Sequence, residues 1–208
     1  MFHVKREEIQ SVADFSLSPL IISRLQSFAD LLAHWNTRIN LISRHDLADL
    51  WQRHIADSLQ LIPFMPDELS SAIDLGSGAG FPGFVLAIAT GIPFTLIETD
   101  QRKAAFLSEA ARLTNAPVRI RNARIEDVTS PRTRLLTARA LAPLPTLLTF
   151  ADTFLAPDGI ALFPKGKNLE PELTQASRQW HMRLDRLPSR TNPEASVLRV
   201  SEIRRVRV

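Results

Sequence analysis

The segment from residue 72 to residue 83 reads Ala-Ile-Asp-Leu-Gly-Ser-Gly-Ala-Gly-Phe-Pro-Gly, and it decides the fold. It holds four of the seven glycines of the chain, at positions 76, 78, 80 and 83. The apolar residues before the glycines predict a short buried strand, and the wholly apolar residues 84–89 predict a buried helix. A strand, a glycine turn and a helix present free backbone N–H groups and a helix N-terminus to a ligand. The segment therefore predicts a nucleotide-like ligand at the turn.

The glycines alone do not identify this ligand. Residues 78–83 fit the G-x-G-x-x-G pattern of dinucleotide sites, which is a weak signal by itself. Asp74, in the strand itself, would repel a pyrophosphate but would suit a cationic amino-acid group, directly or through water. The spacing of Asp74, Gly76, Gly78 and Gly80 resembles the first motif of S-adenosylmethionine (SAM) methyltransferases. We predict Asp74, Gly76 and Gly78 as cofactor-binding, with SAM favoured over NAD and both still open.

Composition limits the class of protein. The 208 residues are 45% hydrophobic and 23% charged, as in an ordinary globular domain with an extension. The sequence has no apolar run of about 18 residues, so we expect no membrane span. Acidic residues and the lack of an apolar run in residues 1–8 argue against a signal peptide. Cysteine is absent, which excludes disulfides and thiolate metal sites. We expect a cytoplasmic protein that is monomeric and has no metal.

The order of the predicted elements indicates an α/β fold. Ser18 and Pro19 predict a helix start, and a second helix is predicted from Asp46 to about residue 61. Residues 1–65 should form a helical extension packed on a methyltransferase-like domain of residues 66–208. In that domain strands and helices alternate, which predicts a doubly wound, mainly parallel, Rossmann-like sheet. A turn is predicted at 157–159, and successive strands at 182–187 and 196–208 predict an antiparallel C-terminal edge.

Polar residues follow the predicted parallel strands, where ligands bind in such sheets. Glu98 ends the second strand and could accept the ribose hydroxyls of SAM or NAD alike, or could be a surface acid. Ile125 and Glu126 follow the third strand and either flank an adenine or belong to a helix-capping turn. Arg139 follows the fourth strand and could pair with the methionine carboxylate of the cofactor or with an RNA phosphate.

Basic residues are concentrated in one part of the chain. Between positions 102 and 139 there are nine lysines or arginines and three acids. Six arginines crowd the end of this part, namely Arg119, Arg121, Arg124, Arg132, Arg134 and Arg139. They form either a solvated face or a surface that contacts phosphates.

Several motifs together resemble one known family. In chain order they are Trp35-Asn36-x-x-x-Asn40-Leu41, Arg53-His54-x-x-Asp57-Ser58-Leu59, the glycine segment 74–83, Asn122-Ala123-Arg124, Arg139-Ala140-Leu141-Ala142-Pro143-Leu144 and Lys165-Gly166. The sequence resembles the RsmG (GidB) family, bacterial methyltransferases that act on guanine N7 of 16S ribosomal RNA. The resemblance runs from about residue 31 to residue 167, and the Gly-Phe-Pro-Gly and Arg-Ala-x-Ala-Pro-Leu segments are its most specific parts.

The resemblance implies a cofactor, a substrate and a set of contacts. The cofactor is SAM, and the partner is 16S rRNA or a small ribosomal subunit particle. Cofactor contacts are implied at Gly76, Phe81, Ile125, Glu126 and Arg139, with Glu98 at the ribose. Because guanine N7 carries a lone pair and no proton, no general base is needed. An NAD-type oxidoreductase and an RNA-binding protein without catalysis are the alternatives.

The remaining candidates are basic or polar side chains near the predicted site. Arg124, Arg139 and Lys165 are candidates for RNA binding, and Arg139 and Lys165 are also the candidates for a catalytic contribution. Lys165 could equally be a surface lysine. We expect the strand end before it to splay, because Pro164 cannot donate a ladder hydrogen bond. His54 and Asp57 lie on one helical face and could be a catalytic pair, but we favour a structural pair that ties the N-terminal helices to the sheet or the cofactor loop.

Overall fold

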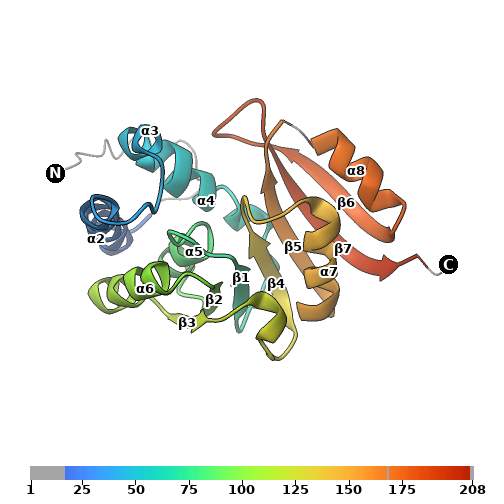
Figure 1. The fold of residues 1–208 in the computed structure, drawn as a ribbon, viewed down its shortest axis with the longest axis horizontal. Helices are drawn as coiled ribbons and strands as arrows, with labels where there is room; N and C mark the ends of the chain where they lie inside the picture. The colour runs from blue at the N-terminus through green and yellow to red at the C-terminus, as the bar shows by residue number, and fades with distance from the viewer. Residues whose placement is uncertain (1–16, 168, 207–208) are drawn as a thin grey trace.

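The computed structural model of the chain describes residues 17–167 and 169–206. The expectation about residues 1–8 lies outside this part. In the described part, seven strands form one sheet in the order β3-β2-β1-β4-β5-β7-β6 (Figure 1). The strands are β1 Ala72–Leu75, β2 Phe94–Glu98, β3 Val118–Asn122, β4 Thr133–Ala138, β5 Leu155–Lys165, β6 Trp180–Pro188 and β7 Ser196–Arg205. β1 to β5 are parallel and β7 is antiparallel to both of its neighbours, which confirms the predicted sheet and its antiparallel edge.

Helices cover both faces of the sheet, each over its own apolar core. One core joins the sheet to α2 (Pro19–Asn36), α5 (Gly83–Thr90) and α6 (Gln101–Thr114). The other joins it to α7 (Leu144–Phe154) and α8 (Leu169–Ser177). Strand alternation separates the two, since Phe94 and Leu96 of β2 belong to the first core and Ile97 to the second. Figure 1 shows α2 beside α6 at one end of the sheet and α8 over β6 and β7 at the other.

The first helix forms as its sequence predicts. The Ser18 hydroxyl caps α2 by accepting the Ile21 N–H at 3.3 Å. Leu25, Phe28 and Leu32 are buried on its inner face. Because these side chains share a core with α5 and α6, the division of the chain near residue 65 stays a prediction.

The predicted helix from Asp46 to residue 61 is wrong as a continuous element. The chain there forms α3 (Arg44–Ala48), the π-helical turn η1 (Trp51–Ala56) and α4 (Asp57–Leu59), followed by the 3-10 turn η2 (Ile62–Phe64). Asp49 leaves helical geometry with φ −107° and ψ 25°. The apolar spacing was compatible with one helix, but periodicity does not distinguish α-helical from π-helical turns.

Two expectations about β5 are also wrong. The predicted turn at 157–159 lies inside this strand, where the register with β4 slips from Thr133–Leu155 to Leu135–Ile160. Turn residues are accommodated there because the ladder is interrupted. Pro164 does not splay the strand end, because β7 continues to pair opposite it and opposite the next residue.

Candidate active site

The glycine turn leaves the carboxyl end of β1 and enters α5. Gly76, Gly78 and Gly80 have φ values of +60°, +55° and +95°, which disfavour other residues. A Cβ at Gly80 would lie 2.9 Å from Phe84 Cβ, and one at Gly83 would lie 2.7 Å from Asp74 Cγ. At Gly78 the nearest atom would be the Gly76 carbonyl oxygen, at 3.8 Å. Gly80 and Gly83 therefore allow close packing, while Gly78 leaves space for a ligand to approach the backbone.

Glu98 ties this turn to the next strand and helix. Its side chain is 6% exposed, with Oε2 accepting the Gly78 N–H at 2.7 Å and Oε1 accepting the Asp100 N–H at 2.8 Å. The Asn122 amide donates to the Glu98 carbonyl at 2.9 Å, which joins the ends of β2 and β3. Each carboxylate oxygen has a second lone pair. Glu98 can therefore hold the turn and still accept ribose hydroxyls, a role that stays a prediction.

Asp74 lies beneath the turn and is fully buried. Its Oδ1 accepts the Thr137 hydroxyl at 2.5 Å, while Oδ2 lies beside the backbone of Gly83 and accepts no well-formed hydrogen bond. Burial raises the pKa of Asp74 to about 6, against the lowering effect of the hydroxyl donors. With no exposed atom, Asp74 can influence a cofactor only through the turn that packs on it.

The turn after β3 carries three predicted site residues. Ile125 and Glu126 form the 3-10 turn η3 (Ile125–Asp127), at the carboxyl edge where they were expected. Ile125 is buried, whereas Glu126 is exposed and pairs with Arg124 Nε at 3.7 Å. Contact of this turn with an adenine stays a prediction.

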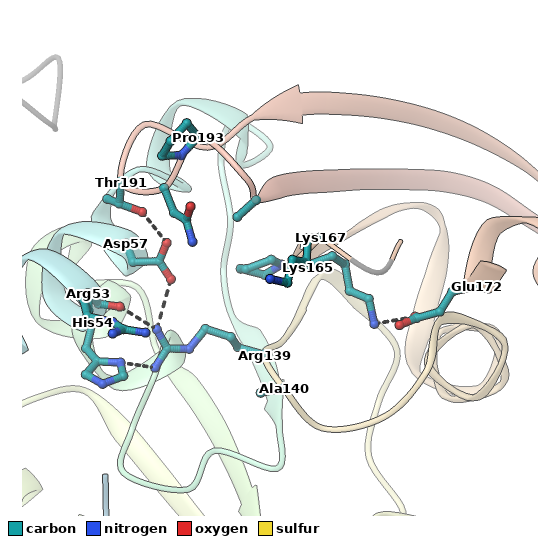
Figure 2. Close-up of a pocket in the computed structure, with 14 residues that line it drawn as sticks. Arg53, His54, Asp57, Arg139, Ala140, Lys165, Lys167, Glu172, Thr191 and Pro193 are labelled. Atoms are coloured by element: carbon teal, nitrogen blue, oxygen red, sulfur yellow. Dashed lines mark hydrogen bonds and ion pairs between the residues drawn. The ribbon is translucent and has the colours of Figure 1, made fainter. Parts of the chain in front are cut away.

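Arg139 is the centre of a cluster that joins η1 to the glycine turn (Figure 2). Its Nη1 donates to Asp57 Oδ2 at 3.0 Å and to the Arg53 carbonyl at 3.2 Å, and its Nη2 donates to His54 Nδ1 at 2.7 Å. The guanidinium lies 5.1 Å from the centre of the Phe81 ring. The His54 ring stacks on the same phenyl ring at 4.8 Å, so Phe81 is largely covered by the cluster.

His54 is neutral in this cluster. Burial, together with the charge of Arg139, lowers the pKa of His54 to about 4. Because the guanidinium can only donate, Nδ1 is the acceptor and the proton lies on Nε2, which is buried and has no partner among the residues that the structure describes. His54 and Asp57 both bind Arg139 rather than each other. These contacts agree with the structural interpretation of the pair.

A cavity of about 710 Å³ opens beside this cluster. Its walls come from η1, the end of β4, the end of β5, α8 and the loop 189–195 between β6 and β7. Gln60 and Asp57 hold that loop in place: Gln60 Oε1 accepts the Arg190 N–H at 2.8 Å, and Thr191 donates to Asp57 Oδ1 at 2.7 Å. The sequence contains no local signal for this contact between distant segments.

Lys165 faces another part of this cavity and is already paired. Its Nζ lies 2.6 Å from Glu172 Oε2 and donates to the Ala142 carbonyl at 3.2 Å. The side chain is 12% exposed and in Figure 2 extends away from Arg139. The exposed Lys167, which sequence reasoning missed, is the more accessible cation on the wall. Among the described residues no group of three His, Asp or Glu side chains could hold a metal ion.

Comparison with known proteins decides the family. The family model described as rRNA small subunit methyltransferase G matches residues 21–193. The chain belongs to the GidB family. A relative named ribosomal RNA small subunit methyltransferase G from Gluconobacter oxydans is 54% identical over 88% of this chain and 94% of its own length. A relative of the same name from Granulibacter bethesdensis is 49% identical over 99% of this chain and 100% of its own length.

Solved structures share the fold of this GidB chain at low sequence identity. A TehB-like SAM-dependent methyltransferase from Corynebacterium glutamicum superposes with a TM-score of 0.55 at 17% identity, covering 76% of this chain and 96% of that one. M. jannaschii TYW2 in complex with AdoMet has a TM-score of 0.57 at 14% identity, covering 82% of this chain and 80% of that one. These likenesses confirm the methyltransferase-type fold. No helix in the described ranges is long and apolar enough to cross a membrane.

Proposed function

We propose that this protein transfers the methyl group of SAM to N7 of a guanine in 16S rRNA of the small ribosomal subunit. The observation that carries the proposal is the open glycine turn, with the Glu98 carboxylate at its side, in a chain of the GidB family. Relatives at 49–54% identity bear the name ribosomal RNA small subunit methyltransferase G. This name supports the substrate class, and the family resemblance supports the guanine N7 atom.

The residues of the turn suit SAM better than a dinucleotide. The backbone around Gly78 leaves space for a nucleoside, and Glu98 keeps free lone pairs for its ribose. The buried carboxyl group of Asp74 beneath the turn disfavours a pyrophosphate. His54 is neutral and its Nε2 is buried, so it does not serve as the acid or base of hydride transfer. When bound, SAM supplies an electrophilic methyl group on a sulfonium.

The acceptor guanine would enter the 710 Å³ cavity beside Arg139. The cavity adjoins the glycine turn through the contact of Arg139 with Phe81, and its rim carries Arg53 and Lys167. Guanine N7 has no proton to lose, so the protein needs no base there. Asp57 and Glu172, the carboxylates on the wall, are already held by Arg139 and Lys165. The chain's contribution is therefore orientation of the base, an effect that can supply roughly 7–11 kcal/mol.

We further propose a monomer that works in the cytoplasm without a metal. The exposed large apolar side chains of the described part are only Leu20 on α2 and Leu113 on α6, fewer than a stable dimer interface would need. Size-exclusion chromatography with light scattering and metal analysis of the purified protein test this. A stable dimer or a stoichiometric metal would contradict it.

The decisive experiment is tritiated methyl transfer from SAM to 16S rRNA and to small subunits that lack the modification. We expect labelled 7-methylguanosine after digestion, and tight binding of SAM but not NADH. Arg139→Lys should lose most of the turnover because a lysine cannot bond Asp57 and His54 together, whereas Arg183→Lys on β6 is the matched control. SAM binding without methyl transfer to either RNA would refute the substrate, and NADH binding in place of SAM would refute the cofactor.

A further inference from the structure

The structure sorts the six arginines of the basic segment by what their side chains contact. Four have partners: Arg124 pairs with Glu126, Arg132 donates to the Leu155 carbonyl at 2.6 Å, Arg134 pairs with Asp158 at 2.8 Å, and Arg139 binds Asp57. Arg119 and Arg121 are different, because neither guanidinium forms an ion pair or hydrogen bond with any other part of the chain that the structure describes. Whether the basic segment is a solvated face or a surface that contacts phosphates can therefore be tested on Arg119 and Arg121.

Arg119 and Arg121 lie on a face of β3 that no helix of the described residues covers. Val118 and Ile120 of the same strand pack toward α6, so the arginines between and after them point to the opposite face, where both are exposed. The connection from β3 to β4 consists of η3 and the extended residues 128–132. On this side of the sheet, α7 packs on β4, β5 and β7 instead. Strand β3 is also an edge of the sheet.

The surroundings of the two arginines are cationic and partly hollow. A cavity of about 180 Å³ is lined by Arg119, Arg121, Arg132, Thr95 and residues 128–131, with no acidic side chain in its lining. The Cα atoms of Arg119 and Arg121 are about 7 Å apart, two residues along one strand. Arg121 immediately precedes Asn122, whose amide bonds to the Glu98 carbonyl at the cofactor end of the sheet. Arg121 therefore lies near the carboxyl edge at which the proposed site lies, whereas the cavity opens toward the amino ends of β1 and β4, where Ser71, Ala72 and Thr133 also line it.

We infer that Arg119 and Arg121, with Arg132 beside them, form a phosphate-binding face for RNA outside the target nucleotide; this inference rests on the RNA substrate of the proposed function. Unpaired arginines present a planar fork of donors that matches a phosphate and retain full charge at neutral pH. The absence of acids in the lining makes the face complementary to a polyanion. A competing explanation is that the charges only keep the β3 edge from pairing with other strands.

The test compares two double variants with the same change in charge. Arg119→Gln/Arg121→Gln removes the face, and Arg178→Gln/Arg183→Gln removes two exposed arginines near the opposite edge strand, β6. Methyl transfer to unmodified small subunits and binding to 16S rRNA are measured between 50 and 300 mM salt. For the first variant we expect KM for RNA to rise about three- to tenfold and the log–log salt slope to fall by about two. The control should retain the wild-type KM and slope.

Further measurements separate this inference from its alternatives. The Kd for SAM and the turnover at saturating RNA should be unchanged in both double variants, because neither touches the glycine turn. An unchanged KM and salt slope in the first variant, or an equal effect in the control, would overturn the inference. Self-association of the first variant with unchanged KM would also overturn it, in favour of edge protection. If the wild-type protein binds RNA through this face but transfers no methyl group, the inference is supported and only the proposed function is refuted.

Discussion

Replacing Asp74 with asparagine should change how the stability of the protein depends on pH. The side chain is fully buried, and its Oδ2 accepts no well-formed hydrogen bond. Burial raises its pKa from 3.8 to about 6 in the folded protein. Below pH 3.8 the carboxyl group is protonated whether the chain is folded or unfolded, so the shift has no effect on stability there. Between about pH 4 and pH 6 the unfolded chain ionises first, and the folded state is progressively disfavoured.

The size of the effect follows from the shift in pKa. A difference of about 2 units corresponds to about 3 kcal/mol, lost from the wild type by pH 7 and absent in Asp74→Asn. Burying the amide adds a cost of its own, about 1–3 kcal/mol, but that cost does not vary with pH. His54, whose pKa is lowered to about 4, also titrates in this range. It is present in both proteins and cancels from the difference between them.

The measurement is urea unfolding followed by circular dichroism at pH 4, 5, 6, 7 and 8. We expect the free energy of unfolding of Asp74→Asn, relative to wild type, to increase by about 2.4 kcal/mol between pH 4 and pH 7, because part of the effect is already present at pH 4. Asp152→Asn, at an exposed position on α7, is the control for general effects of removing a carboxylate. A difference between wild type and Asp74→Asn that stays constant within about 0.5 kcal/mol over this range would refute the reasoning.

Two further predictions concern packing and charge pairing. In Gly83→Ala the new Cβ would overlap Asp74, so we expect the free energy of unfolding measured in urea to fall by about 2–3 kcal/mol. Gly166→Ala should be near neutral, because no described atom would lie within 4 Å of its Cβ. Equal effects of the two substitutions would contradict the packing argument. A double-mutant cycle of Lys165→Gln and Glu172→Gln should give a coupling of about 1–3 kcal/mol with little change in the KM for RNA. A large rise in KM from Lys165→Gln alone would instead support the predicted RNA-binding role of Lys165.

The parts of the fold that the sequence predicted well are those with local signals. The strand at 72–75, the glycine turn and the helix after it were located to within a residue, because apolar runs and glycines act over short distances. The split of the predicted helix at 46–61 was missed because its apolar spacing fits α- and π-helical turns alike. The strand through 157–159 was missed because an interrupted ladder accommodates turn residues.

The site was predicted in part, and the missing part is made of contacts between distant segments. Glu98 and Arg139 were predicted because ligands bind at the carboxyl ends of parallel strands, and their contact with a cofactor stays a prediction. Arg139 binds His54 and Asp57, which lie 85 and 82 residues earlier in the chain. No local sequence pattern predicts these two contacts. Lys165 was predicted as a candidate for RNA binding or as a surface lysine, and its role stays a prediction. Its pairing with Glu172 depends on where α8 packs, which spacing along the chain does not specify.

The hydrogen bond from Thr191 to Asp57 joins residues that are 134 positions apart, and this separation affects when the parts of the site are synthesised. A ribosome adds roughly 5–20 residues per second, so the two partners of this bond emerge roughly 7–27 seconds apart. Until translation has passed residue 195, the acceptor cavity lacks the wall that the β6–β7 loop supplies. The glycine turn and the π-helical segment are made much earlier. A nascent chain therefore carries the proposed cofactor half of the site before it has the complete cavity proposed for the base, so we expect RNA to be accepted only after the β6–β7 loop has been made.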